Sequence, residues 1–139
     1  MPVEVALVFD KEGKTIAFHE PAGRGPENIP DTRSHWEVLE ENWDRLGGVA
    51  HVHPWSGNAI PSPTDVTTFR AIEKGLGKIL LWVVVTFDQV TYWRWSGKKA
   101  TSPDGDYVLV HAEPSAPGVE IEPEIQGIER LRELSRGEE

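Results

Sequence analysis

The stretch HVHPWSGNAIPSPTD, residues 51–65, decides the fold because it joins a strand to a helix. Residues 49–53 form a short, mainly apolar segment that is followed by a proline, which is typical of a strand that ends at a loop. Ser62 suits the N-cap of the next helix, Pro63 suits its first position, and Asp65 falls in the first turn. The apolar stripe expected along this helix consists of Val66, Phe69, Ile72 and Leu76.

The sequence before this stretch predicts a hairpin and a long loop. Residues 3–9 and 15–19 have strand character, and the turn between them, residues 10–14, contains Gly13, which tolerates a positive φ. Residues 20–33 hold three prolines and two glycines without periodicity, so they are expected to form a loop.

A helix is expected to follow this loop. It begins at Ser34, which has capping-box spacing to Glu37. Its apolar face is formed by Trp36, Leu39, Trp43 and Leu46. We expect the pair Gly47 and Gly48 to end this helix.

The sequence after residue 65 predicts further strands and a final helix. Residues 78–87, KILLWVVVTF, are almost all apolar, as in a strand that is covered on both faces. Strands are also expected at 90–95 and 107–111, with a polar loop between them. Residues 123–136 have the spacing of an amphipathic helix that packs on the sheet, with a dimer contact as the alternative.

Together these elements predict an α/β fold: one mostly antiparallel mixed sheet flanked by helices. Residues 1–112 would form the core domain. Residues 113–139 would add a connector rich in proline and acidic residues, followed by the C-terminal helix.

The composition narrows the classes of function. The chain has 139 residues and no cysteine, so any metal ion must be held by imidazole and carboxylate groups. The net charge of −9 argues against a nucleic-acid partner, which would need a basic face. The sequence has no apolar run of about 18 residues and its first residues do not resemble a signal peptide. We therefore expect no membrane association and a cytoplasmic location.

Three residues of the opening stretch predict a metal site. Residues i and i+2 of a strand point to the same face, so His51 and His53 present two imidazoles side by side. The side chain of Asp65, in the first turn of the following helix, can reach these two histidines. Such a set leaves a fourth position open for water, which is the pattern of a catalytic site with one Zn²⁺ per chain. The alternatives are a chance His-x-His pair and a Ser62–Asp65 pair that only caps the helix.

HVHP followed by SPTD resembles the JAMM (MPN-plus) motif, which is His-x-His-Pro, a spacer and Ser-x-x-Asp. Members of this family, prokaryotic ones included, are zinc metalloproteases that remove ubiquitin or ubiquitin-like proteins from lysine side chains or process related C-terminal tails. The resemblance covers the order of elements from about residue 3 to residue 95. It implies the cytidine-deaminase-like fold of the JAMM/MPN domain and a protein or peptide substrate of ubiquitin-like character. Val52 differs from the Ser or Thr usual between the two histidines.

The resemblance also implies roles for individual residues. The family places a glutamate at the start of its first core strand, and Glu4 fits that position. Glu4 would be the general base that takes a proton from the attacking water and passes it to the leaving amine. Ser62 would stabilise the oxyanion, and the three residues named above would be the zinc ligands. Glu20 is the alternative base, and Glu12 is a weaker one because it lies in the turn.

Two functional hypotheses follow from these residues. The first is an active zinc hydrolase that cleaves a peptide or isopeptide bond, and the second is a JAMM-like scaffold without catalysis. A hydrolase of another amide, such as a cell-wall peptide, is a further alternative. The complete ligand set favours the enzyme, because inactive relatives usually lose one or more of these residues. Trp55, which directly follows the motif, is the tryptophan expected to stack on a substrate.

Overall fold

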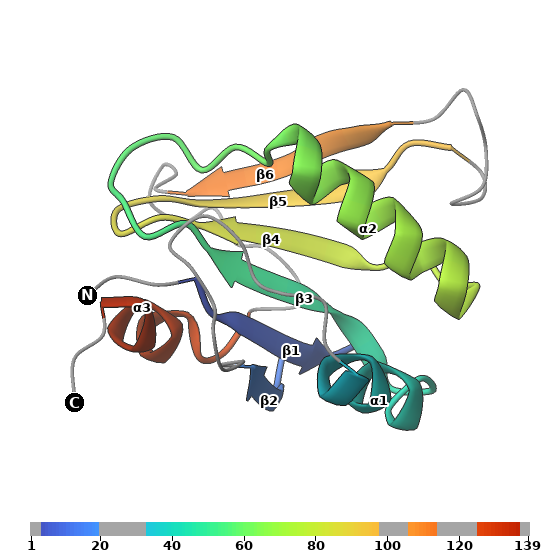
Figure 1. Ribbon diagram of the computed structural model, residues 1–139. Coiled ribbons are helices and arrows are strands. Elements are labelled where there is room, and N and C mark those ends of the chain that lie inside the picture. The colour runs from blue at the N-terminus through green and yellow to red at the C-terminus, as the bar shows by residue number, and fades with distance from the viewer. Residues whose placement is uncertain (1–3, 20–32, 98–105, 114–124, 137–139) are drawn as a thin grey trace.

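Three almost fully buried strands, β1, β3 and β4, form the centre of a six-stranded sheet (Figure 1). The computed structural model describes residues 4–19, 33–97, 106–113 and 125–136. The sheet order is β2-β1-β3-β4-β5-β6, in which β3 and β4 are parallel and all other neighbours are antiparallel. The strands are β1 Ala6–Asp10, β2 Thr15–His19, β3 Leu46–Val52, β4 Leu81–Val85, β5 Val90–Trp95 and β6 Tyr107–Glu113. The helices are α1 Arg33–Glu41, α2 Pro63–Leu76 and α3 Ile128–Arg136.

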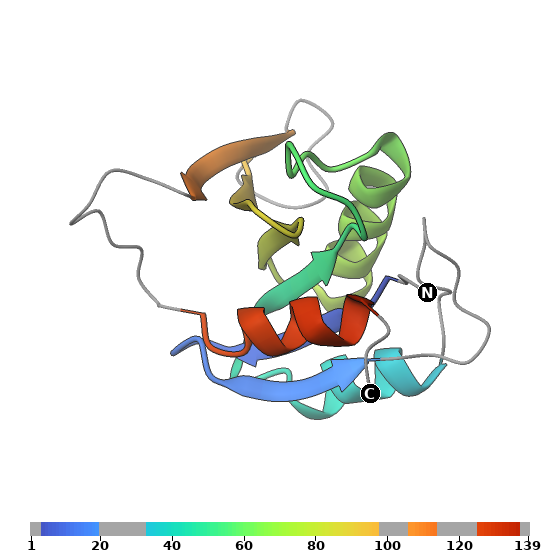
Figure 2. The ribbon, with the colours of Figure 1, turned by 90° about the vertical axis from the view of Figure 1, so that its left-hand side faces the viewer.

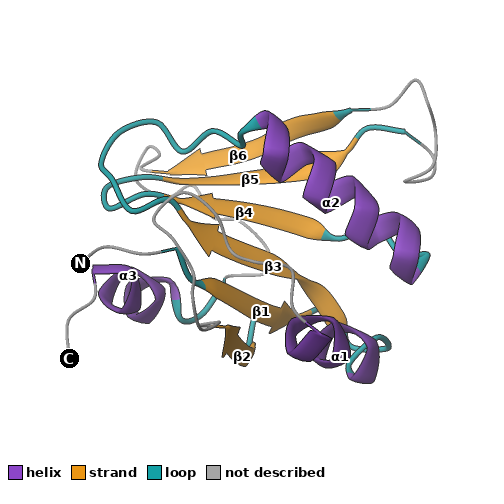
Figure 3. Cartoon of the chain, in the orientation of Figure 1, coloured by secondary structure: helices purple, strands orange, loops and turns teal. Residues whose placement is uncertain are grey.

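Different helices cover the two faces of the sheet. Leu7 and Phe9 of β1 point to one face, where Leu131 of α3 completes the core, and Figure 2 shows α3 alongside β1. Ala6 and Val8 point to the opposite face, which packs against α1 and α2 (Figure 3). This alternation is the period of two expected of a strand. The result is a single α/β domain with a mostly antiparallel mixed sheet, as the sequence predicted.

The predicted end of the first helix is wrong. α1 stops at Glu41, and the two glycines expected to end it lie inside β3. A Cβ atom on Gly48 would lie 1.9 Å from the Leu81 carbonyl oxygen, and one on Gly47 would lie 2.2 Å from the Asp10 carbonyl oxygen. The glycines are therefore needed for close approach between β3 and both neighbouring strands, and not for a helix cap.

Other expectations agree with the structure. β2 and β5 have the predicted bounds, and all five residues of β4 are buried. α3 packs on the sheet, since Leu131 is fully buried against it. Most of the predicted loop at 20–33 lies outside the described residues, but its last residue, Arg33, begins α1. Most of the connector expected at 113–122 also lies outside them, but its first residue, Glu113, ends β6. Parts of the 96–106 loop are likewise outside the described residues. Among the described residues, no helix is both long enough and apolar enough to cross a membrane.

Candidate metal centre

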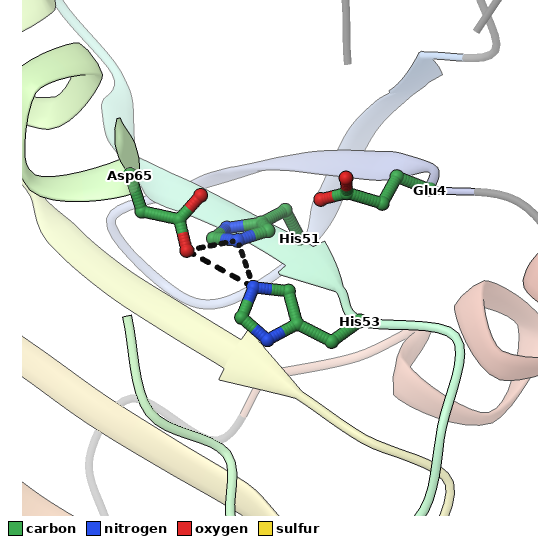
Figure 4. Close-up of side chains that lie close together, drawn as sticks. All are labelled: Glu4, His51, His53 and Asp65. Atoms are coloured by element: carbon green, nitrogen blue, oxygen red, sulfur yellow. Dashed lines mark hydrogen bonds and ion pairs between the residues drawn. The ribbon is translucent and has the colours of Figure 1, made fainter. Parts of the chain in front are cut away.

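Four side chains from three parts of the sequence meet at one end of the sheet (Figure 4). Glu4 precedes β1, His51 lies in β3, His53 directly follows it, and Asp65 lies in the first turn of α2. Each offers one nitrogen or oxygen atom, and these four atoms all lie within 4.8 Å of one another. The structure therefore brings together the three predicted ligands and the predicted base.

Strand register places Glu4 and the two histidines on one face. β1 pairs with β3 so that Ala6 lies opposite His51. Glu4 is two residues before Ala6, so both side chains point to the face that α2 covers. The Val52 N–H donates to the Val5 carbonyl oxygen at 3.1 Å, which continues the pairing to the residue beside Glu4. Glu4 is therefore held inside the protein, with 1% of its surface exposed.

Three of the atoms form a small, nearly regular triangle. His51 Nε2 lies 3.0 Å from His53 Nε2, and Asp65 Oδ2 lies 3.2 Å from the first nitrogen and 3.0 Å from the second. Ligand atoms at about 2.0–2.1 Å from a tetrahedral Zn²⁺ are separated by about 3.3 Å. The triangle thus has almost the size that three zinc ligands require. Three atoms in mutual contact form three close pairs. Each of the two imidazoles can place only one proton on its Nε2, so hydrogen bonds can satisfy at most two of these pairs.

The start of α2 fixes the Asp65 carboxylate. Ser62 is the N-cap: its Oγ accepts the Asp65 N–H at 3.0 Å, and its own N–H donates to Asp65 Oδ2 at 2.8 Å. This capping box holds the same oxygen that faces the histidines. Burial alone would raise the pKa of Asp65, but hydrogen bonds from His51 and His53 outweigh it and hold that pKa well below its usual range. Asp65 is therefore a carboxylate, the form that binds a metal ion.

Two substitutions can separate the two roles of Asp65, which are metal binding and helix capping. Asp65→Asn keeps an oxygen that can accept the Ser62 N–H but removes the anionic ligand, so zinc affinity should fall by roughly 10²-fold or more. Ser62→Ala should keep zinc and lower the free energy of unfolding by about 1 kcal/mol through the lost cap. Metal competition with a coloured chelator and urea unfolding would measure the two effects. Equal zinc affinity in Asp65→Asn and the wild type would show that Asp65 only caps the helix.

The loop between β3 and α2 is anchored by the hairpin that joins β4 and β5. The Gly57 N–H donates to Asp88 Oδ1 at 2.8 Å, and the Ala59 N–H donates to Gln89 Oε1 at 2.7 Å. Thr86 Oγ1 donates to the Gly57 carbonyl oxygen at 2.7 Å. Asp88 and Gln89 thus position this loop, a role that the sequence does not predict. No local pattern could reveal them, because their partners lie about 30 residues away in the chain.

Trp55 lies in this anchored loop, at the edge of the cluster. Its ring centroid is 4.7 Å from that of His53, and 43% of its surface is exposed. The Phe87 N–H donates to the Trp55 carbonyl oxygen at 2.9 Å, so the backbone of the loop is fixed here. Trp55 therefore presents an exposed aromatic surface beside the histidines.

A cleft of about 300 Å³ opens on the other side of the cluster, between α1, α2 and the sheet. Glu4, His51 and Asp65 form one end of it. The rest of the lining is mostly apolar or aromatic and includes Trp36, Val49, Phe69, Ala71, Ile72 and Trp82. No local sequence pattern indicates this cleft, because it is formed by residues of two helices and three strands that meet only in the fold.

His35 also lines the cleft, and it carries no charge at neutral pH. Its ring stacks on His19 with centroids 4.3 Å apart. Burial, together with the His19 imidazole, lowers the pKa of His35 to about 4. His19 and His35 therefore pack against each other, and neither belongs to the four-residue cluster.

Glu73 is a second buried carboxyl group, and it serves the structure of α2. Its Oε2 accepts the Leu80 N–H at 2.7 Å, and its Oε1 accepts the Tyr107 hydroxyl. Burial raises the pKa of Glu73. These bonds join the C-terminal half of α2 to the sheet and so help to fix the helix that carries Asp65. The alternative base Glu20 lies outside the described residues.

No family model, no curated protein and no solved structure matches this chain.

Proposed function

We propose that this protein is a zinc-dependent hydrolase of the JAMM (MPN-plus) type that cleaves peptide or isopeptide bonds. The observation that carries the proposal is the convergence of His51 Nε2, His53 Nε2 and Asp65 Oδ2 within 3.0–3.2 Å, with buried Glu4 beside them. The resemblance of HVHP and SPTD, which contain these residues, to the motif of that family also supports it.

The donor set favours zinc in a catalytic site. Two imidazoles and one carboxylate are typical of catalytic zinc, whereas structural zinc usually has four protein ligands that include thiolates. The chain contains no cysteine. With three ligands, a fourth position remains for water or substrate. When bound, zinc would lower the pKa of water and polarise the carbonyl group that is attacked.

The residues around the triangle can perform the remaining steps of amide hydrolysis. Glu4 would take a proton from the water as its oxygen bonds to the carbonyl carbon, and would pass that proton to the leaving nitrogen as the C–N bond breaks. The products are a carboxylate and an amine. The hydroxyl of Ser62 accepts the Asp65 N–H through its oxygen, so that bond leaves its proton available for the developing oxyanion.

We propose a protein or peptide substrate, in particular a ubiquitin-like conjugate or precursor. Trp55 supports this view because an exposed indole beside the site can stack on an extended chain. A cell-wall peptide would be an alternative amide substrate for the same chemistry.

The test is metal-dependent hydrolysis. Protein purified without chelator should contain one zinc per chain by elemental analysis. It should cleave at least one probe from a panel of lysine-linked ubiquitin-like conjugates, linear ubiquitin-like fusions and cell-wall peptides. Removal of zinc should stop cleavage and its return should restore it. One zinc per chain with no cleavage of any probe would favour the scaffold hypothesis, and no zinc would contradict the zinc-dependent hydrolase.

A further inference from the structure

The cleft shares residues with the cluster on one side only. Glu4, His51 and Asp65 line it, whereas His53 and Trp55 are not among its lining residues. A substrate that crosses the site would therefore meet the cleft on the Glu4 side and the indole of Trp55 on the His53 side.

The proton path decides which part of the substrate lies on the Glu4 side. Under the proposed function, Glu4 gives its proton to the leaving nitrogen, so that nitrogen must lie close to the Glu4 carboxylate. The side chain of the residue that carries this nitrogen then extends toward the cleft. Trp55 is left for the part of the chain that carries the carbonyl group.

The lining of the cleft defines the chemistry of that side chain. The large apolar residues of the lining are Trp36, Phe69, Ile72 and Trp82, and His35, which also lines the cleft, is neutral. The threonines of α2 that line it, Thr64, Thr67 and Thr68, are exposed and bring no charge. A volume of about 300 Å³ is at the small end for ligand pockets and suits one large side chain.

We propose that this cleft binds a large apolar side chain, such as leucine or phenylalanine, on the residue whose nitrogen leaves. The inference rests on the proposed function and narrows its substrates from peptide and isopeptide bonds to peptide bonds with an apolar residue directly after the cleaved bond.

One protein variant and its matched control test the inference. Ala71 lines the cleft and is exposed on α2, so Ala71→Phe should fill the cleft without disturbing the core. Lys74 is also exposed on α2 but does not line the cleft, so Lys74→Phe adds the same side chain elsewhere on that helix.

The first measurement is kcat/KM for quenched peptides that differ only in the residue after the cleaved bond, which is glycine, leucine or phenylalanine. The zinc-loaded protein should prefer leucine and phenylalanine over glycine by roughly 10- to 100-fold, the effect of burying one large apolar side chain. Ala71→Phe should lose this preference and still cleave the glycine peptide, and Lys74→Phe should behave as the wild type. Equal kcat/KM for the three peptides would overturn the inference and leave the proposed hydrolysis intact.

The second measurement does not need turnover. L-phenylalaninamide should shift the indole N–H resonances of Trp36 and Trp82 in the zinc-loaded protein, and glycinamide should not. The shifts should be absent in Ala71→Phe and present in Lys74→Phe. Unchanged resonances with phenylalaninamide would overturn the inference, whether or not peptides are cleaved. Specific shifts without cleavage of any peptide would contradict the proposed hydrolysis and still support an apolar binding site in the cleft.

Discussion

The variant His51→Ala, His53→Ala is expected to bind no zinc. The two imidazole nitrogens form two corners of the triangle, and without them Asp65 is the only remaining member of the proposed ligand set. A single carboxylate holds zinc weakly compared with a three-ligand site, so affinity should fall by several orders of magnitude. Elemental analysis after gel filtration should change from one ion per chain to none.

The control for this experiment is a histidine outside the cluster. His111 lies in β6, and His111→Ala should keep one zinc per chain. Both histidines are buried, so their loss leaves a cavity that lowers stability. Circular dichroism would therefore check that the double variant retains its sheet and helices. Full zinc content in a folded double variant would place the metal elsewhere and contradict the site.

Glu4→Gln should keep zinc at full occupancy and slow hydrolysis by roughly 10²- to 10⁴-fold, the usual contribution of a general base. Glutamine has the size of glutamate but cannot take a proton at neutral pH, so the expected loss is in kcat. The Glu4 oxygen lies within 4.8 Å of the three ligand atoms, a separation that one water molecule can bridge. Steady-state kinetics with the best probe, together with elemental analysis, would measure both effects.

Two outcomes would change the role of Glu4. Loss of zinc in Glu4→Gln would make Glu4 a fourth ligand, and unchanged kcat would remove it from the reaction. Glu12→Gln is the matched control, because Glu12 is exposed in the β1–β2 turn and should affect neither zinc nor turnover.

Local patterns predicted those parts of the fold that depend on neighbouring residues. The apolar run of β4 and the Ser62-Pro63 start of α2 are such cases, because burial and capping depend on short sequence windows. The gathering of His51, His53 and Asp65 was predictable in the same way: a strand period of two and a helix start together limit where these side chains can point. The expectation that Glu4 lies inside the sheet came from the apolar strand after it and from the family resemblance.

Other features depended on contacts between distant segments. The apolar spacing of Trp43 and Leu46 favoured a longer helix, but β3 begins at Leu46 because Gly47 and Gly48 let it fit between β1 and β4. The bonds from Asp88 and Gln89 to the loop before α2 are likewise invisible until the hairpin is placed. Tertiary packing decided both, and a single sequence carries no local mark of it.

Through the capping box of Ser62 and Asp65, the start of α2 is part of the cluster. Metal binding would therefore affect the lifetime of the protein. Glu4 and Asp65 bring two acidic groups together beside the junction of β3 and α2, so a bound cation would stabilise that junction. An ion that binds only the native chain would add about 2.7 kcal/mol when its free concentration is 100 times its dissociation constant. Cells triage partly opened chains by proteolysis, so differences of that size alter abundance. Metal supply would then set how much of this protein survives, as well as whether it is active.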